Sequence, residues 1–376
     1  MKIRLNYRLV VLLVLLAGLT AREVALELRP SFLRPGLHLF AYVGNTGDGT
    51  VTAIDLVKLA PAATIPVGPE PSGIRANPAR PEVWGLSTSG GYAWVLDAPT
   101  NRIVARIPVG AAPYALDFSP DGSRAYIAAS GSNSVISIDC ATRQVVARAR
   151  AGRRPWIARV SQDGKTVVVS NRDDSTVSLL DGASLTPLGV VRVAADPDQI
   201  AILPDGSKAF VTSSTHDEVS VVDVKRKVLL ANLELGGTPD GLVLKPDGGE
   251  LYIPSANAHG LVIVNTQMNE VGDFLLVGMS PAAATITDDA QILYVSDRAA
   301  GHVVPVAIQN RQILSRPISV GQSPATGHLT PGGDMLLVVD TASDDLAVIR
   351  SNAPTPSLTT LIPTGLHPRD LAIKVF

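Results

Sequence analysis

Charged residues recur in this chain at a fixed distance from a series of prolines. Arg75, Asp117, Arg159 and His328 each lie four residues after one of them. The first three belong to consecutive segments and alternate in sign. Because buried charges need partners, this alternation favours a structural chain of ion pairs between neighbouring segments. Binding of an anionic ligand is the alternative, and His328 is then a candidate axial ligand of a metal-containing cofactor.

A second group of polar residues lies directly around the same prolines, together with an aromatic residue that follows one of them. Such convergent charges beside an aromatic ring are typical of ligand-binding surfaces. The members that we consider for ligand binding are Arg153, Arg154, Trp156, Asp198, Asp240 and Arg369.

Three histidines also follow prolines at nearly constant distance: His216, His259 and His302 lie 19, 20 and 21 residues after Pro197, Pro239 and Pro281. A shared metal ion would need imidazole nitrogens about 2 Å from it, which is closer than equivalent loops of adjacent segments usually come. We therefore interpret them as solvated loop histidines. A pH- or ligand-responsive patch is the alternative.

These prolines mark an internal repeat. Each follows a glycine or alanine by three residues, and the intervals between successive prolines are 42, 42, 42, 42, 42, 43 and 44 residues. The markers are Gly68 and Pro71, Gly110 and Pro113, Gly152 and Pro155, Ala194 and Pro197, Gly236 and Pro239, Gly278 and Pro281, Gly321 and Pro324, and Gly365 and Pro368. A period of roughly 40–45 residues with four strands per unit is the signature of a β-propeller.

The unit at residues 107–152 shows the four strands clearly. Short runs with period-2 alternation are separated by turn residues, first at Pro120-Asp121-Gly122 and then at two polar breaks. Equivalent Asp-Gly turns follow the first strand of other units, where both residues tolerate the required backbone angles. Aspartates that close the third strand are expected to cap the next turn by accepting backbone N–H groups: Asp55, Asp97, Asp139, Asp181 and Asp223.

The repeat predicts an all-β, eight-bladed propeller with four antiparallel strands per blade. Residues 38–67 hold three strands that lack a first strand, and the segment after Pro368 supplies one at the other end of the chain. We expect this C-terminal strand to join the three N-terminal ones, which leaves no free edge in the ring. A seven-bladed ring is the alternative, and its degenerate unit would be residues 324–365.

The N-terminal residues 1–21 are typical of a secretory signal. Lys2, Arg4 and Arg8 precede the apolar run Leu9–Leu16, which is shorter than the ~20 residues that span a bilayer. An uncleaved signal anchor is the alternative, because Leu19-Thr20-Ala21 is a poor cleavage site. The predicted domains are therefore the signal at 1–21, a linker at 22–37 and the propeller at 38–376. The predicted location is extracytoplasmic, periplasmic or secreted, with a signal of bacterial type.

Composition excludes several classes of protein. The net charge of −2 argues against a general nucleic-acid binder, which would carry a basic surface. The single cysteine, Cys140, rules out an intrachain disulfide, a cysteine-based zinc site and a CxxCH haem attachment. We interpret it as a small buried thiol. No catalytic triad, phosphate-binding glycine loop or metal-binding motif is present.

Several strands and junctions resemble the YVTN-repeat (YncE-like) family of β-propellers over residues 38–376. The matching stretches are Tyr42-Val43-Gly44-Asn45, Val51 to Asp55, Val169-Ser170-Asn171, Tyr252-Ile253 and Tyr294-Val295-Ser296. This resemblance implies the fold but no activity, since that family has no shared catalytic motif. The eight units are also similar to the haem d1-binding propeller of nitrite reductases.

The main functional hypothesis is an exported binding or scaffold module without a resident cofactor or metal. Its partner, an unidentified protein or small ligand, is expected on the face with the inter-blade loops, near the central channel. A membrane tether is expected only through an uncleaved N-terminal segment. One alternative is a hydrolase, lactonase or lyase with a divalent metal at the channel mouth. The other is a haem d1-like cofactor-binding propeller, with His328 or His367 as the residue to test.

Overall fold

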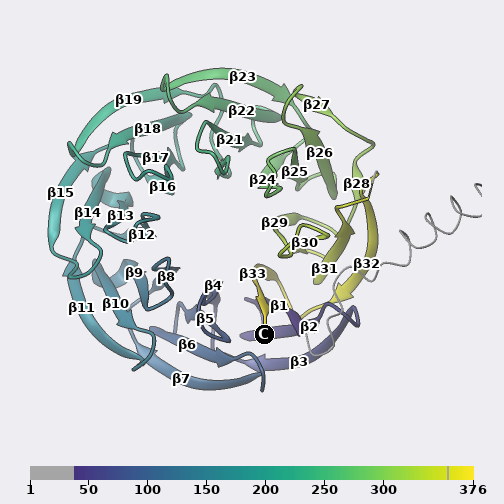
Figure 1. Cartoon of the computed structure of the whole chain (residues 1–376), viewed down its shortest axis with the longest axis horizontal. Helices are drawn as coiled ribbons and strands as arrows, with labels where there is room; N and C mark the ends of the chain where they lie inside the picture. Colours follow the sequence, from purple (N-terminus) through teal and green to yellow (C-terminus); the bar gives the residue numbers. More distant parts are fainter. Residues whose placement is uncertain (1–37, 354) are drawn as a thin grey trace, which may run out of the picture. The chain divides into compact units, whose positions relative to one another are not determined.

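The computed structural model describes residues 38–353 and 355–376. The predicted signal and linker lie outside these described residues. Residues Leu39–Phe376 form a ring of eight β-sheets around a central channel (Figure 1). In this part of the chain the helical elements are two 3-10 turns, η1 (Ser130–Ser132) and η2 (Arg172–Asp174). The described residues include no helix that is long and apolar enough to cross a membrane.

The eight-bladed prediction is confirmed, and seven of the blades run outward from the channel in chain order, while the eighth begins with the last strand and continues with the first three. The innermost strands are β33 (Pro368–Val375), β4 (Pro71–Ala76), β8 (Pro113–Phe118), β12 (Pro155–Val160), β16 (Pro197–Ile202), β20 (Val243–Leu244), β24 (Pro281–Ile286) and β29 (Pro324–Leu329). The second strands are β1 (Leu39–Asn45), β5 (Glu82–Ser87), β9 (Arg124–Ala129), β13 (Thr166–Asn171), β17 (Lys208–Ser213), β21 (Glu250–Ser255), β25 (Ile292–Asp297) and β30 (Met335–Asp340).

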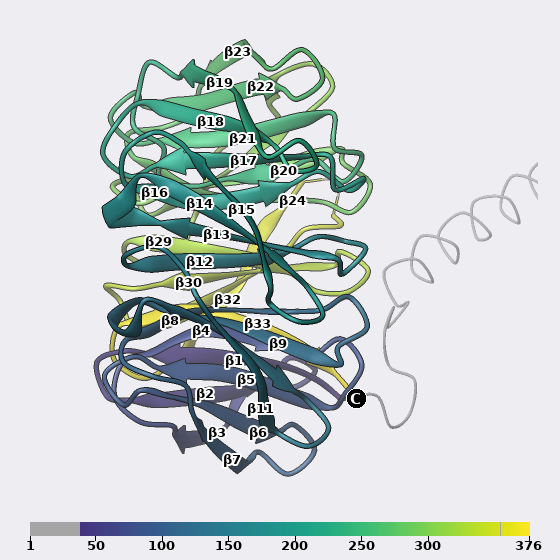
Figure 2. The ribbon, with the colours of Figure 1, turned by 90° about the vertical axis from the view of Figure 1, so that its left-hand side faces the viewer.

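The third strands are β2 (Thr50–Asp55), β6 (Tyr92–Asp97), β10 (Ser134–Asp139), β14 (Thr176–Asp181), β18 (Glu218–Asp223), β22 (Gly260–Asn265), β26 (His302–Ala307) and β31 (Asp345–Arg350). The outermost strands are β3 (Ala60–Pro66), β7 (Arg102–Pro108), β11 (Gln144–Arg150), β15 (Pro187–Arg192), β19 (Val228–Glu234), β23 (Glu270–Leu276), β27 (Gln312–Ile313) with β28 (Ile318–Ser319), and β32 (Ser357–Pro363). Second and third strands are buried almost throughout, because the blades pack face to face (Figure 2).

The ring closes as predicted. Strand β33 pairs antiparallel with β1, with Tyr42 opposite Ala372 and Val43 opposite Leu371. Leu371 is fully buried and packs with Val43 and with Leu337 of the preceding blade. The pairing therefore joins the two ends of the propeller through both a β-ladder and the apolar core between two blades.

The predicted turn roles of the aspartates are also confirmed. Asp139 Oδ1 accepts the backbone N–H groups of Ala141 and Thr142 at 3.0 and 2.8 Å. Asp55, Asp97, Asp181 and Asp223 make equivalent bonds after their own third strands. In the first hairpins, Asp-Gly turns place Gly122 and its counterparts at positive φ, a region that glycine enters readily. These residues therefore build the loops at the ends of the strands.

Two blades depart from the regular pattern. The inner strand β20 is only two residues long, whereas its counterparts start at the proline. In the two preceding blades, the hydroxyls of Ser170 and Thr212 accept a backbone N–H from the inner strand at 3.1 and 3.0 Å. Pro254 occupies the corresponding place and offers no such bond, but Leu86 and Ala128 also lack a hydroxyl beside inner strands of six residues, so this difference alone does not explain the short strand. The other departure is the outer strand of the blade 281–323, which is split into β27 and β28.

In three of the blades, a tyrosine on the second strand forms a hydrogen bond to the next blade. The hydroxyls of Tyr42, Tyr126 and Tyr294 donate to Ala98, Gly182 and Ser351 carbonyls at 3.2, 2.6 and 3.1 Å. Each acceptor lies just after the third strand of the following blade. Arg143 reaches Glu82 across the same kind of boundary at 2.8 Å. Such bonds satisfy polar groups that the packed blades would otherwise bury unpaired.

Leu371→Ala tests the closure of the ring. We expect it to lower the free energy of unfolding by roughly 2–5 kcal/mol, because it leaves a cavity between two blades. Leu361→Ala is the matched control, since Leu361 is 40% exposed on β32. The control should change stability by less than about 0.5 kcal/mol. Urea unfolding followed by circular dichroism measures both, and equal small effects would contradict closure through β33.

Candidate functional site

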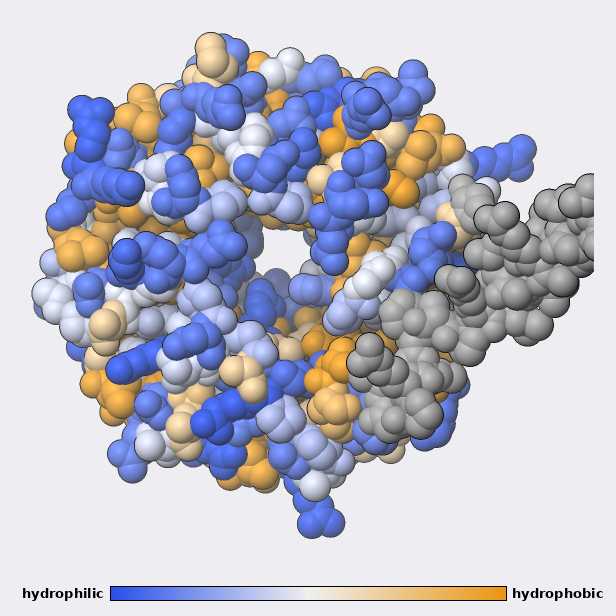
Figure 3. Space-filling model, in the orientation of Figure 1, coloured by the Kyte–Doolittle hydropathy of each residue, from blue (hydrophilic) through white to orange (hydrophobic). Residues whose placement is uncertain are grey.

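A cavity of about 620 Å³ lies at one mouth of the channel, on the face that carries the inter-blade loops and the loops between second and third strands. The channel itself stays open through the ring in the space-filling view (Figure 3). Lining residues come from the composite blade, from the next three blades, and from β16 and β29. The cavity volume lies within the range of sites that hold small ligands and cofactors.

The residue before each inner-strand proline is held by one recurring backbone bond. In seven of the blades its carbonyl accepts the N–H of the residue that follows the second strand, at 2.9–3.1 Å. The acceptors are Glu70, Ala112, Arg154, Asp196, Ser280, Ser323 and His367. We call this bond the loop clip. It joins the two loops of each blade on the cavity face, and so sets the positions of Glu70, Ala112 and His367 at the cavity rim.

An aromatic stack forms part of the cavity wall. The rings of Tyr114 and Trp156 are parallel within 20°, with their centroids 3.5 Å apart. The guanidinium of Arg172 lies 3.8 Å from the Trp156 centroid, so the indole is sandwiched between a phenol and a cation. Arg172 in turn pairs with Asp198 at 2.9 Å. Burial raises the pKa of Tyr114, against the opposing effect of Arg369, and the phenol stays a hydrogen-bond donor.

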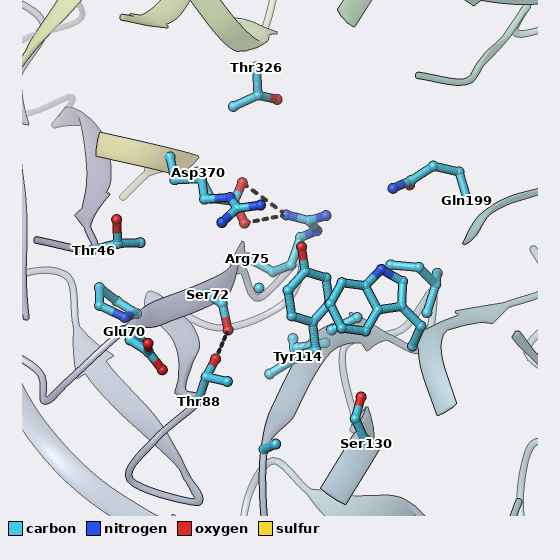
Figure 4. Close-up of a pocket in the computed structure, with 18 of the residues that line it drawn as sticks. Thr46, Glu70, Ser72, Arg75, Thr88, Tyr114, Ser130, Gln199, Thr326 and Asp370 are labelled. Carbon is cyan, nitrogen blue, oxygen red and sulfur yellow. Dashed lines mark hydrogen bonds and ion pairs between the residues drawn. The ribbon is translucent and has the colours of Figure 1, made fainter. Parts of the chain in front are cut away.

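The channel below this mouth carries charges from neighbouring inner strands. Arg75 Nη1 lies 3.4 Å from Asp370 Oδ2 (Figure 4) and donates to the Ile74 carbonyl at 2.8 Å. The predicted chain of ion pairs through Arg75, Asp117 and Arg159 is therefore wrong, because neither arginine forms an ion pair with Asp117. Arg75 turns to Asp370 of the composite blade, because ring closure brings β33 beside β4.

Asp117 and Arg159 lie close enough to interact electrostatically, but they do not form an ion pair within 4 Å. Both oxygens of Asp117 instead accept backbone N–H groups, from Phe118 and Val160, at 3.1 Å. Burial is the largest influence on Arg159 and lowers its pKa, although the Asp117 carboxylate acts in the opposite direction.

His328 lies on β29, within the electrostatic reach of Arg75 and Asp370. Burial lowers its pKa to about 4, the nearby Arg75 guanidinium adds to the effect, and Asp370 opposes it. The imidazole is therefore neutral at neutral pH, which is the form that ligates metals.

The remaining predicted residues lie outside the cavity wall. Arg153 and Arg154 are exposed and pair with Asp174 and Asp173 at 2.5 and 3.0 Å. Asp240 accepts the N–H of Ala256 at 2.8 Å. Asp198 acts through Arg172, as described above. Of the ten predicted ligand-binding residues, those that line the cavity are Arg75, Trp156, Arg159 and Arg369.

The three loop histidines do not converge. His216 Nδ1 contacts the Thr215 hydroxyl at 2.9 Å, and His259 Nδ1 contacts the Met279 carbonyl at 2.6 Å. Within residues 38–353 and 355–376, no group of three or more His, Cys, Asp or Glu side chains is placed to hold a metal ion. Cys140 is buried, as expected, and burial raises the pKa of its thiol to about 12.

Several cavity residues were missed by the sequence analysis, although they follow a regular pattern. Six of them lie two residues after an inner-strand proline: Gly73, Ala115, Ile157, Gln199, Thr326 and Asp370. The ligand-binding residues predicted from the sequence lie four residues after a proline or directly around one, and none lies two residues after it. Side chains alternate between the two sides of a strand, so the residues two and four positions after the proline point to the same side. Comparing all eight units at the second position would have identified these residues.

A carboxyl pair on the same face of the ring also escaped notice. Asp340 and Asp345 lie opposite each other where β30 joins β31. Burial and the Asp345 carboxyl raise the pKa of Asp340 to about 8, so one of the two carboxyls carries a proton at neutral pH. Asp340 Oδ2 accepts the N–H of Gly321 at 2.9 Å, which ties this pair to the inter-blade loop.

Fold and site together define an eight-bladed β-propeller with a cavity of mixed polar and apolar lining at one mouth of its channel. A family model described as the cytochrome D1 heme domain matches residues 86–236, which is less than half of the chain. That span includes the aromatic stack, Arg159 and Gln199. No curated protein matches the chain.

Many solved structures have similar folds, among them the following two. Dihydro-heme d1 dehydrogenase NirN, in complex with DHE, has a TM-score of 0.73 and 16% identity, over 88% of this chain and 74% of that one. Hydrazine synthase of Kuenenia stuttgartiensis has a TM-score of 0.61 and 18% identity, over 75% of this chain and 96% of that one. These likenesses support the eight-bladed fold, while the YVTN resemblance stays a prediction from the sequence.

His328→Gln should make the stability of the protein less dependent on pH. The pKa of His328 is lower in the folded chain, so between about pH 6.5 and pH 4 only the unfolded chain binds this proton. Wild-type stability should therefore fall relative to the variant by about 2 kcal/mol from pH 7 to pH 5. Urea unfolding at both pH values measures this difference.

The comparison with a variant is needed because Asp340 changes the stability of the protein with pH in the direction opposite to His328. Its raised pKa makes the folded chain the better proton acceptor between about pH 4 and pH 8. Subtracting variant from wild type cancels that contribution. His216→Gln, an exposed loop histidine on the same face, is the control. An identical pH dependence in wild type and His328→Gln would contradict the assignment.

Proposed function

We propose that this propeller binds a carboxylate-bearing iron tetrapyrrole of the haem d1 type in the cavity at the channel mouth. This is the cofactor-binding alternative of the sequence analysis, and it replaces the general scaffold as the preferred function. The observation that carries it is the 620 Å³ cavity walled by the stacked Tyr114 and Trp156 rings. A flat aromatic wall beside cations suits a planar, anionic ligand.

The residues present fit such a group. Arg369 is exposed at the cavity, and its charge acts on the Tyr114 phenol. It makes no hydrogen bond or ion pair with another described residue, so its guanidinium is available to a carboxylate. His367 lines the rim, whereas His328 is a neutral imidazole on the inner strand β29 that does not line this cavity. Either histidine supplies the nitrogen ligand that haem iron commonly takes.

The comparisons support this choice among the ligands that such a cavity accommodates. The matching family model is that of a heme domain, and its matched span contains Tyr114 and Trp156. The structure with a TM-score of 0.73 is a dehydrogenase whose name gives dihydro-heme d1 as its substrate. We propose the same class of ligand here.

The chain's own contribution would be binding and orientation. A bound haem d1-type group supplies an iron centre for redox chemistry. Tyr114, backed by Trp156, would cover one side of the ligand, Arg369 would hold a carboxylate, and a histidine would supply a nitrogen ligand to the iron. The loop clips position these residues before any ligand arrives, which lowers the entropic cost of binding.

Titration of the purified full chain with haemin tests the proposal. We expect a saturable shift of the Soret absorption near one equivalent. Trp156→Ala should raise the Kd at least about tenfold, because it removes the ring that holds Tyr114 in place in the cavity wall. Phe274→Ala is the matched control, since Phe274 is an exposed aromatic on the outer strand β23. No saturable shift, or equal affinities for the two variants, would refute the proposal.

A second measurement identifies the histidine. His367→Ala and His328→Ala should differ in the absorption spectrum of the ferric complex, because only the ligating side chain changes the field at the iron. His216→Ala should leave that spectrum unchanged. If neither His367→Ala nor His328→Ala alters it, the proposed ligation is wrong even where haemin binds.

The predicted export is part of the same proposal. It rests on the residue pattern of 1–21, and fractionation of cells that express the full chain tests it. Recovery in the cytoplasmic fraction would contradict export.

A further inference from the structure

The two carboxylates in the charged half of the channel are already occupied by backbone donors. Asp370 Oδ2 accepts the N–H of Ile74 and Oδ1 that of Leu371, both at 2.9 Å. Asp117 accepts Phe118 and Val160 in the same way, as described above. Each carboxylate thus satisfies an otherwise unpaired N–H on the inner edge of the next blade. Their role is to complete the inner strands.

Arg75 and Arg159, the two arginines beside these carboxylates, have few hydrogen-bond acceptors within the protein. Arg75 makes one good hydrogen bond, to the Ile74 carbonyl at 2.8 Å, and approaches Asp370 only to 3.4 Å. Arg159 makes no hydrogen bond or ion pair with any described residue. Its side chain lines the cavity and remains partly exposed to the channel. A guanidinium that is surrounded by protein and lacks a partner is costly, unless a ligand completes its hydrogen bonds.

The position of these arginines places them below the aromatic stack. Both lie four residues into their inner strands, whereas Tyr114 and Trp156 lie one residue after the proline, at the mouth. Arg75 acts electrostatically on both Arg159 and His328, so it lies within reach of each. The neutral amide of Gln199 also lines this cavity, on β16 (Figure 4).

We propose that Arg75 and Arg159 form an anion subsite in the channel, below the mouth, that takes a small planar oxyanion or carboxylate. The planar guanidinium fork matches two oxygens of such a ligand. Gln199 adds an amide donor across the cavity. The subsite does not depend on the proposed tetrapyrrole, because its donors belong to the protein alone.

Calorimetric titration of the purified full chain, without added tetrapyrrole, tests the subsite with acetate as the probe. We expect saturable binding of acetate and none of acetamide, the neutral molecule of similar shape. Arg159→Gln should weaken acetate binding at least about tenfold, since it removes charge-assisted hydrogen bonds. Arg159→Lys keeps the charge but loses the fork, and should weaken binding by about three- to tenfold.

Arg192→Gln is the matched control, because it changes the net charge equally at an exposed position on the outer strand β15. It should alter the acetate Kd by less than about twofold. Absence of saturable acetate binding would overturn the subsite. So would equal binding of acetamide, or wild-type affinity in Arg159→Gln, provided that its melting temperature is unchanged.

A second experiment distinguishes two possible ligands of Arg159, a free anion and a carboxylate of a bound tetrapyrrole. Protoporphyrin IX and its dimethyl ester are titrated into wild type and Arg159→Gln. If Arg159 binds a free anion, the variant should bind both porphyrins like wild type. The contrary result has two parts: acetate does not bind, and Arg159→Gln loses affinity for protoporphyrin IX but not for its dimethyl ester. That result would refute the anion subsite and leave the proposed function standing.

Discussion

The antiparallel pairing of β1 with β33 is the constraint on which the rest of the ring depends. A stack of blades leaves an exposed edge and an exposed apolar face at each end, and neither is stable in water. Here the last strand completes the first blade, and Leu371 fills the core shared with the blade before it. The same pairing brings Asp370 beside Arg75, so the closure also builds part of the cavity wall.

Regularity on the cavity face comes from backbone bonds rather than from particular side chains. The loop clip recurs in seven of the blades and requires only a carbonyl and an N–H. Side chains at the cavity rim are therefore free to vary from blade to blade without disturbing the fold. The result is an asymmetric site on a nearly symmetric ring, with aromatic and charged residues gathered over a few neighbouring blades.

The roles of the charged residues in the channel follow from the unpaired backbone N–H groups of the innermost strands. An innermost strand has a partner on one side only, so its channel-facing N–H groups must be satisfied by side chains or water. Asp117 and Asp370 do this for the neighbouring blades. Because these carboxylates are committed to the backbone, Arg75 and Arg159 keep donor groups for a ligand. Burial meanwhile keeps His328 neutral.

Period, turn residues and the incomplete first unit were enough to predict eight blades and the closing strand, because those features depend on local geometry and chain length. The ion pairs were not predictable in the same way. Arg75 meets Asp370, 295 residues later in the chain, because ring closure brings β33 beside β4, and Asp117 accepts a backbone N–H of the next blade instead of pairing with an arginine. The sequence by itself determined the architecture and the face that carries the cavity. Only the closed ring decided which residues meet, since residues from opposite ends of the chain come into contact when the first and last strands pair.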